Sequence, residues 1–195
     1  MRLSLALMLA LVAMPCFAAA KVKSFKAPVQ VAQYTNANGT AKIIAVADIF
    51  SDTKDPTTFI QEIAPYLSRL TERNQAEFCA SLATNDKGMY AARITTSKTR
   101  SACPITDAVP PGYKDARSDV HTHVDITRYQ PTKEEKIFLQ QKYGPNDFVR
   151  TYAHAFSDGD LQQPNAYLVT NKVILYFPGG TEKDIEVLWE EDETP

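Results

Sequence analysis

The chain has 195 residues, with 21 lysine and arginine residues against 23 aspartate and glutamate residues. Because this near-neutral balance lacks a basic excess that would attract phosphate groups, nucleic acid is not an expected partner. Hydrophobic residues at 44% and charged residues at 23% indicate a globular protein rather than a disordered or acidic tail. The scarce residue types are more informative, since the chain has three cysteines and three histidines, and all the histidines lie between residues 121 and 154.

Residues 1–20 have the layout of a cleavable secretory signal. One arginine precedes an apolar run at residues 3–14, and small residues lead up to Ala20, after which we expect cleavage. The run is shorter than the roughly 20 apolar residues of a membrane-spanning helix, so no transmembrane segment is expected. Attachment of a lipid at Cys16 is the weaker alternative, because Pro15 stands where a small residue is usual. The predicted location is the periplasm or the exterior of the cell.

Two cysteines, Cys79 and Cys103, remain after loss of the signal. An even number of cysteines in an exported protein indicates a disulfide, which would stabilise the fold by about 3 kcal/mol. The alternative is that Cys79 is a thiol nucleophile paired with His121, as in a cysteine peptidase. An oxidising compartment favours the disulfide.

In the first third of the chain, the hydrophobic pattern predicts a hairpin and then a helix. Strands are expected at residues 24–34 and 41–50, around a turn at residues 36–39. Asp55 followed by Pro56 is typical of a helix start. Pro65 is expected to kink or split this helix. Its apolar residues recur at helical spacing: Phe59, Ile60, Ile63, Leu67 and Leu70.

Hairpins and polar segments are expected in the rest of the chain. The predicted elements are a hairpin of strands at residues 77–84 and 89–96, a polar loop at 97–117, a strand at 118–124, a capped helix at 132–143, an extended segment at 148–156 and a hairpin of strands at 166–170 and 173–177. The charged residues 190–195 are expected to fray. This mixed order predicts an α+β fold, with a single domain over residues 21–189.

His121 and His123 form an HxH pair within the strand predicted at residues 118–124. Side chains two apart on a strand share a face, so both imidazoles can approach one point and supply half of a zinc site. Asp160, three residues after Ser157, offers a third ligand, although serine and aspartate at this spacing also occur as helix N-caps. A polar strand face without a metal remains the alternative.

Taken in order, five residues resemble the signature of the JAMM metallopeptidases of the MPN/JAB superfamily: Glu77, His121, His123, Ser157 and Asp160. Residues 156–161 and 166–170 are similar to a bacterial branch of uncharacterised function that is often found at the ends of RHS-type toxin polyproteins. The resemblance covers about residues 56–180. It implies an MPN/JAB-like domain in which a mixed, curved sheet with a cytidine-deaminase-like layout is flanked by helices.

The resemblance implies a zinc ion held by His121, His123 and Asp160, with Glu77 as general base and later acid, and with Ser157 as a donor to the oxyanion. The implied reaction is hydrolysis of an amide or isopeptide bond in a peptide, a peptidoglycan peptide or a protein. Glu62 and Glu72 compete for the role of base, but both are more simply solvated helix residues. His154 is either a structural histidine or a residue near Ser157 that orients a metal ligand.

The chain departs from the family at two places. The family usually has proline or glycine after the second histidine, where this chain has Val124, and its gap before the serine is usually short. Here an insertion at about residues 125–150 precedes the serine, and it is expected to act as a lid or a substrate-specifying loop. The two departures also favour an alternative function, that of a catalytically inactive exported binding or immunity protein that recognises a cognate toxin.

Overall fold

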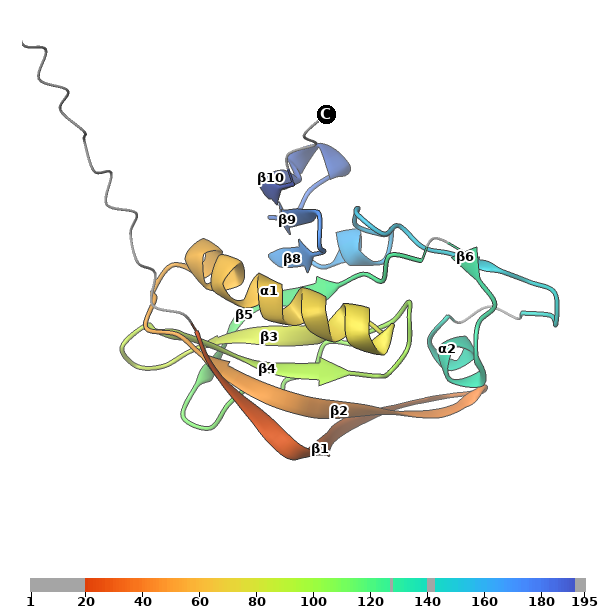
Figure 1. Cartoon of the computed structure of the whole chain (residues 1–195), viewed down its shortest axis with the longest axis horizontal. Helices are drawn as coiled ribbons and strands as arrows, with labels where there is room; N and C mark the ends of the chain where they lie inside the picture. Colours follow the sequence, from red (N-terminus) through yellow and green to blue (C-terminus); the bar gives the residue numbers. More distant parts are fainter. Residues whose placement is uncertain (1–19, 127, 140–142, 192–195) are drawn as a thin grey trace, which may run out of the picture.

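The strands of this protein form one large sheet and one small one in the computed structural model, which describes residues 20–126, 128–139 and 143–191 (Figure 1). The strands are β1 (Lys21–Asn36), β2 (Gly39–Phe50), β3 (Cys79–Thr84), β4 (Tyr90–Thr96), β5 (Lys114–Thr122), β6 (Arg128–Tyr129), β7 (Val149–Arg150), β8 (Ala166–Val169), β9 (Val173–Phe177) and β10 (Glu186–Glu190). The helices are α1 (Pro56–Asn74) and α2 (Lys133–Phe138), with short 3-10 turns η1 (Asp160–Gln162) and η2 (Glu182–Asp184).

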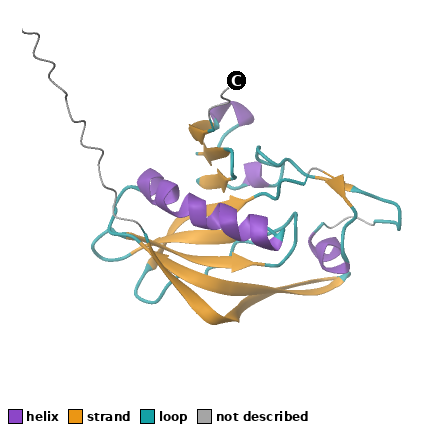
Figure 2. Cartoon of the chain, viewed as in Figure 1, coloured by secondary structure: helices purple, strands orange, loops and turns teal. Residues whose placement is uncertain are grey.

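Eight strands form the large sheet in the order β1-β2-β4-β3-β5-β8-β9-β10, and β6 pairs with β7 separately. Neighbouring strands in the large sheet are antiparallel, except that β5 and β8 run parallel. The sheet is therefore mixed, and two helices accompany it (Figure 2). These features confirm the predicted α+β class and the single domain. The central position of β5 matters most for the site, because this strand carries the HxH pair.

The predicted N-terminal hairpin is confirmed, and both of its strands are longer than expected. β1 and β2 pair up to Asn36 and Gly39, so the turn between them is only two residues long. Gly39 has a φ of +133°, a conformation that a side chain would strain. The tip of the hairpin holds α2, because the side-chain amides of Asn36 and Asn38 donate to the carbonyls of Ile137 and Lys136.

Helix α1 begins as predicted, with Asp55 as N-cap. Its carboxylate accepts a hydrogen bond from the backbone N–H of Thr58 at 2.7 Å. Of the two effects predicted for Pro65, the split is wrong, because α1 runs without interruption through this residue, and the kink stays a prediction. Pro65 lies on the exposed face, where water can bind the Gln61 carbonyl that loses its helical partner.

The core lies between the apolar face of α1 and the sheet. Phe59, Ile63 and Leu67 are fully buried there and belong to one cluster with residues of the strands. The strand members of this cluster include Ile49, Leu82, Ile94, Val120 and Val169. Burial of side chains of this size stabilises the fold by about 1.5–3 kcal/mol each. The cluster therefore holds α1 against the same sheet that carries the candidate site.

The predicted hairpin at residues 77–84 and 89–96 is confirmed as β3 and β4, although β3 begins at Cys79. The polar loop predicted at residues 97–117 is wrong at its end, because β5 already begins at Lys114. The strand predicted at residues 118–124 also needs correction, since β5 stops at Thr122. The start of β5 was missed because its residues are polar, and exposed strand residues lack the hydrophobic alternation from which strands are predicted.

The C-terminal third contains the largest departures from the sequence prediction. The capping box of Thr132 and Glu135 is confirmed, but α2 ends at Phe138, and residues 140–142 lie outside the described residues. Only Val149–Arg150 of the extended segment at 148–156 forms a strand. The hairpin of β8 and β9 is confirmed, whereas β6 and β10 were not predicted. Both lack the long apolar alternation that signals a strand.

The ends of the chain are described only in part. The predicted signal lies outside the described residues except for Ala20, and residues 192–195 of the charged tail also lie outside them. Glu190 is not frayed but closes β10. Within the ranges that the structure describes, none of the helices has the combination of length and apolar character that crossing a membrane requires.

Candidate metal centre

The two histidines of the HxH pair lie at the end of the central strand β5. His121 is within the strand, and His123 follows its last residue. Their ring centroids are 5.1 Å apart, and their side chains are only 9% and 8% exposed. Thr122 points the other way, where its hydroxyl meets Thr71 of α1 at 2.6 Å and accepts from the Phe78 N–H at 2.9 Å. Thr122 thus fixes the alternation that directs both imidazoles to one side.

Asp160 joins the two histidines from a distant part of the chain. Its Oδ1 lies 3.5 Å from His121 Nε2, and its Oδ2 lies 3.4 Å from His123 Nε2. One ligand atom from each residue lies within 4.8 Å of the others, so this group could hold a metal ion. A tetrahedral zinc ion with bonds of about 2.1 Å separates its ligand atoms by about 3.4 Å, which agrees with both distances. The structure thus brings the three predicted ligands together.

Hydrogen bonds with residues outside the ligand group orient two of the three proposed ligands, His123 and Asp160. His123 Nδ1 lies 2.5 Å from the carbonyl oxygen of Tyr152. Since a carbonyl only accepts, Nδ1 carries a proton, and Nε2 of the neutral ring is left with a free lone pair. The hydroxyl and the backbone N–H of Ser157 both donate to Asp160 Oδ2 at 2.7 Å. Such partners commonly fix the orientation of metal ligands.

His121 provides a test of whether these residues fit a metal. Its Nε2 is buried and makes no hydrogen bond of regular geometry among the described residues, and the nearest acceptor, Asp160 Oδ1, is 3.5 Å away. An unsatisfied buried polar atom costs about 1–3 kcal/mol. A cation among the three donors would satisfy this nitrogen, so the donor set fits a metal ion.

The ionisable groups of the site shift one another's pKa values. Burial of Asp160 would raise its pKa, but its close contacts with His121 and His123 outweigh this and hold the pKa well below its usual range. Burial of His123 lowers its pKa, yet Asp160 and the charge of Glu77 raise it to about 9, so a metal ion must displace a proton from this ring to bind. The carboxylate of Asp160 therefore stays ionised, as a metal ligand must.

Glu77 lies in the same cleft, two residues before β3 rather than within that strand as expected. Its N–H donates to the Thr99 carbonyl at 2.8 Å, and its own carbonyl accepts from the Thr96 hydroxyl at 2.7 Å. Burial raises the pKa of its carboxyl to about 8, and Asp160 adds to this while His123 opposes it. The carboxylate makes no hydrogen bond or ion pair with the residues that the structure describes.

The two alternative bases lie elsewhere on α1. Glu62 accepts a hydrogen bond from the Ser51 hydroxyl at 2.6 Å. Glu72 is exposed near the end of the helix. Neither lines the cleft that holds the histidines, whereas Glu77 does.

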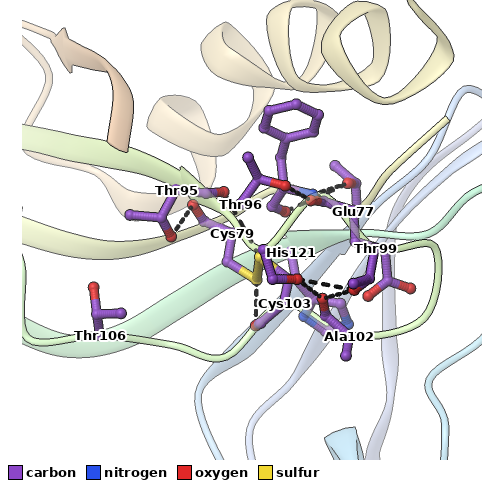
Figure 3. Close-up of a disulfide and its surroundings, with 12 residues drawn as sticks. Glu77, Cys79, Thr95, Thr96, Thr99, Ala102, Cys103, Thr106 and His121 are labelled. Carbon is purple, nitrogen blue, oxygen red and sulfur yellow. Dashed lines mark hydrogen bonds between the residues drawn. A yellow bond between two sulfur atoms is a disulfide. The ribbon is translucent and has the colours of Figure 1, made fainter. Parts of the chain in front are cut away.

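The predicted disulfide is present and borders the site (Figure 3). Cys79 and Cys103 are bonded, with their Cα atoms 5.8 Å apart. Cys79 pairs with His121 across β3 and β5, and Cys103 lines the cleft. Because both sulfur atoms are in the bond, the interpretation of Cys79 as a free thiol nucleophile is wrong for this structure.

A cleft of about 250 Å³ contains these residues, and the insertion forms part of its wall. From the insertion and the segment that follows it, Leu139, Val149 and Tyr152 line the cleft. The insertion is anchored by Glu135 of α2, whose carboxylate accepts the Arg100 N–H at 2.9 Å and Arg100 Nε at 3.1 Å. The segment that carries the disulfide and the insertion are therefore joined beside the site.

His154 does not join the ligand group. Its Nδ1 lies 3.3 Å from the Thr170 hydroxyl, and its Nε2 lies 3.4 Å from the carboxylate of Asp125. It is not among the residues that line the cleft. A role for His154 in orienting a metal ligand stays a prediction, and its observed contacts, with Thr170 and Asp125, are those of a histidine that links two loops.

Asp119 is the cleft residue that sequence reasoning missed. It lies two residues before His121 on β5, and it lines the cleft with only 9% of its surface exposed. Burial raises the pKa of its carboxyl to about 7, with further contributions from Asp160 and Asp115. The sequence could have indicated Asp119, because the alternation of side chains that places His121 and His123 on one face extends back to this residue.

All five residues of the sequence signature line this one cleft: Glu77, His121, His123, Ser157 and Asp160. Comparisons of the chain with protein-family models, curated proteins and solved structures found no match. The residues of the cleft and their geometry are thus the basis for any statement about function.

Proposed function

We propose that the protein is an exported zinc-dependent peptidase or isopeptidase of the JAMM type. The observation that carries the proposal is the convergence of Glu77, the HxH pair and Asp160 in one cleft. These residues come from three separate segments of the chain, so their meeting is a property of the fold. The MPN/JAB-like arrangement of the sheet is part of the same proposal.

The donor set suits a catalytic zinc site better than a structural one. Two imidazoles and one carboxylate, from His121, His123 and Asp160, leave a fourth tetrahedral position open, whereas structural sites use four protein ligands. Zinc bound there would supply Lewis-acid chemistry and lower the pKa of water to about 7. Other divalent ions also accept imidazole and carboxylate ligands, so the metal must be measured.

Glu77 is the residue best placed to move a proton. Its carboxylate is buried in the cleft and has no partner among the described residues, so its oxygens are available to a water or a substrate. It would take a proton from the attacking water and pass it to the leaving amine. The outcome is hydrolysis of an amide bond in a peptide, a peptidoglycan peptide or a protein.

Ser157 positions Asp160, since its hydroxyl and backbone N–H both donate to that carboxylate. Its role as a donor to an oxyanion, which typically contributes about 10²–10³ in rate, remains a prediction. In the structure the hydroxyl proton is directed to Asp160. A change of that hydrogen bond would have to accompany catalysis.

The same observation favours the second candidate function, an inactive exported binding or immunity protein. A serine committed to Asp160 stabilises the loop and leaves the oxyanion without this donor. The insertion, which lines the cleft through Leu139, Val149 and Arg150, would then provide the surface for a cognate toxin.

Export is supported by the disulfide between Cys79 and Cys103, because such bonds persist in oxidising compartments. The proposed signal ends at Ala20, directly before β1 begins at Lys21. Cleavage there would leave every strand of the described fold intact.

Metal content and hydrolysis in matched variants test the proposal. We expect purified protein to bind about one equivalent of zinc and to release free amines from peptidoglycan fragments or a peptide library. Glu77→Gln should keep the zinc and lose hydrolysis, since only the proton acceptor changes. His121→Ala should lose zinc, and Glu72→Gln, at an exposed carboxylate of α1, should keep both properties.

Three results separate the alternatives. The metal proposal fails if the protein binds no zinc above background, or if His121→Ala changes neither metal content nor stability. Loss of zinc in Glu77→Gln would mean that Glu77 is a ligand rather than a base. Capture of a stoichiometric toxin partner that survives chelation and His123→Ala, together with no amine release, would favour the binding protein.

A further inference from the structure

Asp119 is a buried carboxylate that the proposed reaction does not use. It lies on the central strand β5, where it pairs with Ser81 of β3 on one side and Ala166 of β8 on the other. Because residues two apart on a strand share a face, its side chain emerges beside that of His121. The strand rise places the two Cα atoms about 7 Å apart.

The carboxylate of Asp119 has no partner. Among the described residues it makes no hydrogen bond and no ion pair, although 91% of the residue is buried, corresponding to the 9% that is exposed. It lines the cleft, so the exposed remainder faces the space where a substrate would lie. A buried charge without a partner is unfavourable, so a ligand that brings a positive charge to this carboxylate would be stabilised by pairing with it.

The groups around Asp119 favour a cation as that ligand. The charges that act on it come from Asp160 and Asp115, and both are negative. Arg150 is the arginine among the described residues that line the cleft, but it is exposed and forms no ion pair with Asp119. A metal ion held by His121, His123 and Asp160 would offset the charge of Asp160, and Asp119 would remain a buried carboxylate with which a positively charged group of a substrate could pair.

We propose that Asp119 is a specificity-determining residue, which binds an ammonium group of the substrate close to the scissile bond. This inference rests on the proposed metallopeptidase function. The substrate would carry a lysine-like amine within about 7 Å of the bond that is cut, the separation set by two residues of β5. A neutral substrate of the same shape would leave the carboxylate of Asp119 unpaired and bind less tightly.

The test uses two hydroxamate probes that differ only in charge. A hydroxamate group chelates zinc, Nα-acetyl-lysine hydroxamate adds an ammonium group, and Nα-acetyl-norleucine hydroxamate has the same chain without it. Titration calorimetry with the zinc-loaded protein measures both affinities without requiring turnover. We expect the lysine probe to bind about 10-fold more tightly or better, in line with a charge-assisted hydrogen bond.

Two variants separate the subsite from the rest of the cleft. Asp119→Asn keeps the shape of the side chain and removes its charge, so the preference for the lysine probe should disappear while the norleucine probe binds as before. Asp115→Asn, at an exposed carboxylate of the same strand, should keep most of the preference. Far-UV circular dichroism of each variant checks that the fold is unchanged.

The outcomes also distinguish this inference from the function on which it rests. If neither probe binds the zinc-loaded protein, the metal-site proposal fails and the subsite falls with it. If both probes bind equally, or if Asp119→Asn retains the preference, the metal site stands and the ammonium subsite is refuted.

Discussion

Replacement of Glu135 by glutamine tests whether the insertion is held in place by one buried carboxylate. Its side chain is 2% exposed and forms an ion pair with Arg100 at 3.1 Å. It also accepts the Thr132 N–H at 2.6 Å, and this bond is half of the capping box that starts α2. The carboxylate thus joins the insertion to the segment that carries Cys103.

The expected loss follows from these contacts. Removal of one partner of a buried ion pair costs about 3–5 kcal/mol. Two features of this site reduce the cost, because glutamine keeps one carbonyl acceptor and the Arg100 side chain is 27% exposed and can reach water. We therefore expect Glu135→Gln to lower the free energy of unfolding by about 2–3 kcal/mol, which corresponds to about 5–10 °C in melting temperature for a domain of this size.

Urea unfolding at pH 7 with the disulfide intact measures this loss. Glu134→Gln is the matched control, because Glu134 is the exposed neighbour on the same helix and should change stability by no more than about 0.5 kcal/mol. Equal stability of the two variants would refute the idea that Glu135 anchors the insertion.

The pH dependence provides a second check on Glu135. Burial would raise its pKa, but hydrogen bonds from Thr132 and Arg100 outweigh this and lower the pKa below the ordinary 4.5. A lowered folded-state pKa gives stability that is fully present above the unfolded value and lost as the pH falls through the folded value. The difference between wild type and Glu135→Gln should therefore persist from pH 7 to about 4.5 and shrink at lower pH.

Two further predictions concern the disulfide and the metal ligands. Reduction of the bond between Cys79 and Cys103, or replacement of both cysteines by serine, should lower the free energy of unfolding by about 3 kcal/mol, and reductant should then have no effect on the double variant. A reductant effect that persists in the double variant would contradict this assignment. Ser157→Ala should weaken zinc binding about 10–100-fold in a competition titration, because Asp160 loses an orienting hydrogen bond. Ser101→Ala, in the same cleft but without a ligand contact, should leave the affinity unchanged, and an equal loss in both variants would argue against the orienting role.

Much of the site could be predicted from the sequence because its residues have local signatures. The HxH spacing places two imidazoles on one face of any strand, so His121 and His123 could be paired without a structure. Glu77, Ser157 and Asp160 were selected only through the resemblance to a known family, since each residue has an ordinary structural role when considered alone. The assignment of these residues to a zinc peptidase is a proposal. Their position in one cleft is an observed feature of the fold.

Other features had no local signature. Polar residues such as Lys114 and Asp115 open a strand because β3 pairs with them, and pairing with a distant segment cannot be recognised from hydrophobic alternation. Pro65 should have broken its helix by local rules, yet packing of the opposite face keeps α1 continuous. In both cases tertiary contacts outweigh local preference.

The sequence by itself determined the class of fold, the start of α1 and its N-cap, the hairpins and the pair of imidazoles, because these depend on neighbours along the chain. Only the tertiary structure decided which groups surround the imidazoles. The parallel pairing of β5 with β8 and the turn before η1 bring Asp160 within 3.5 Å of His121, and they place Asp119 in the same cleft without a partner. These separations depend on strand order and packing, and residues far apart in the chain meet only when the sheet is complete.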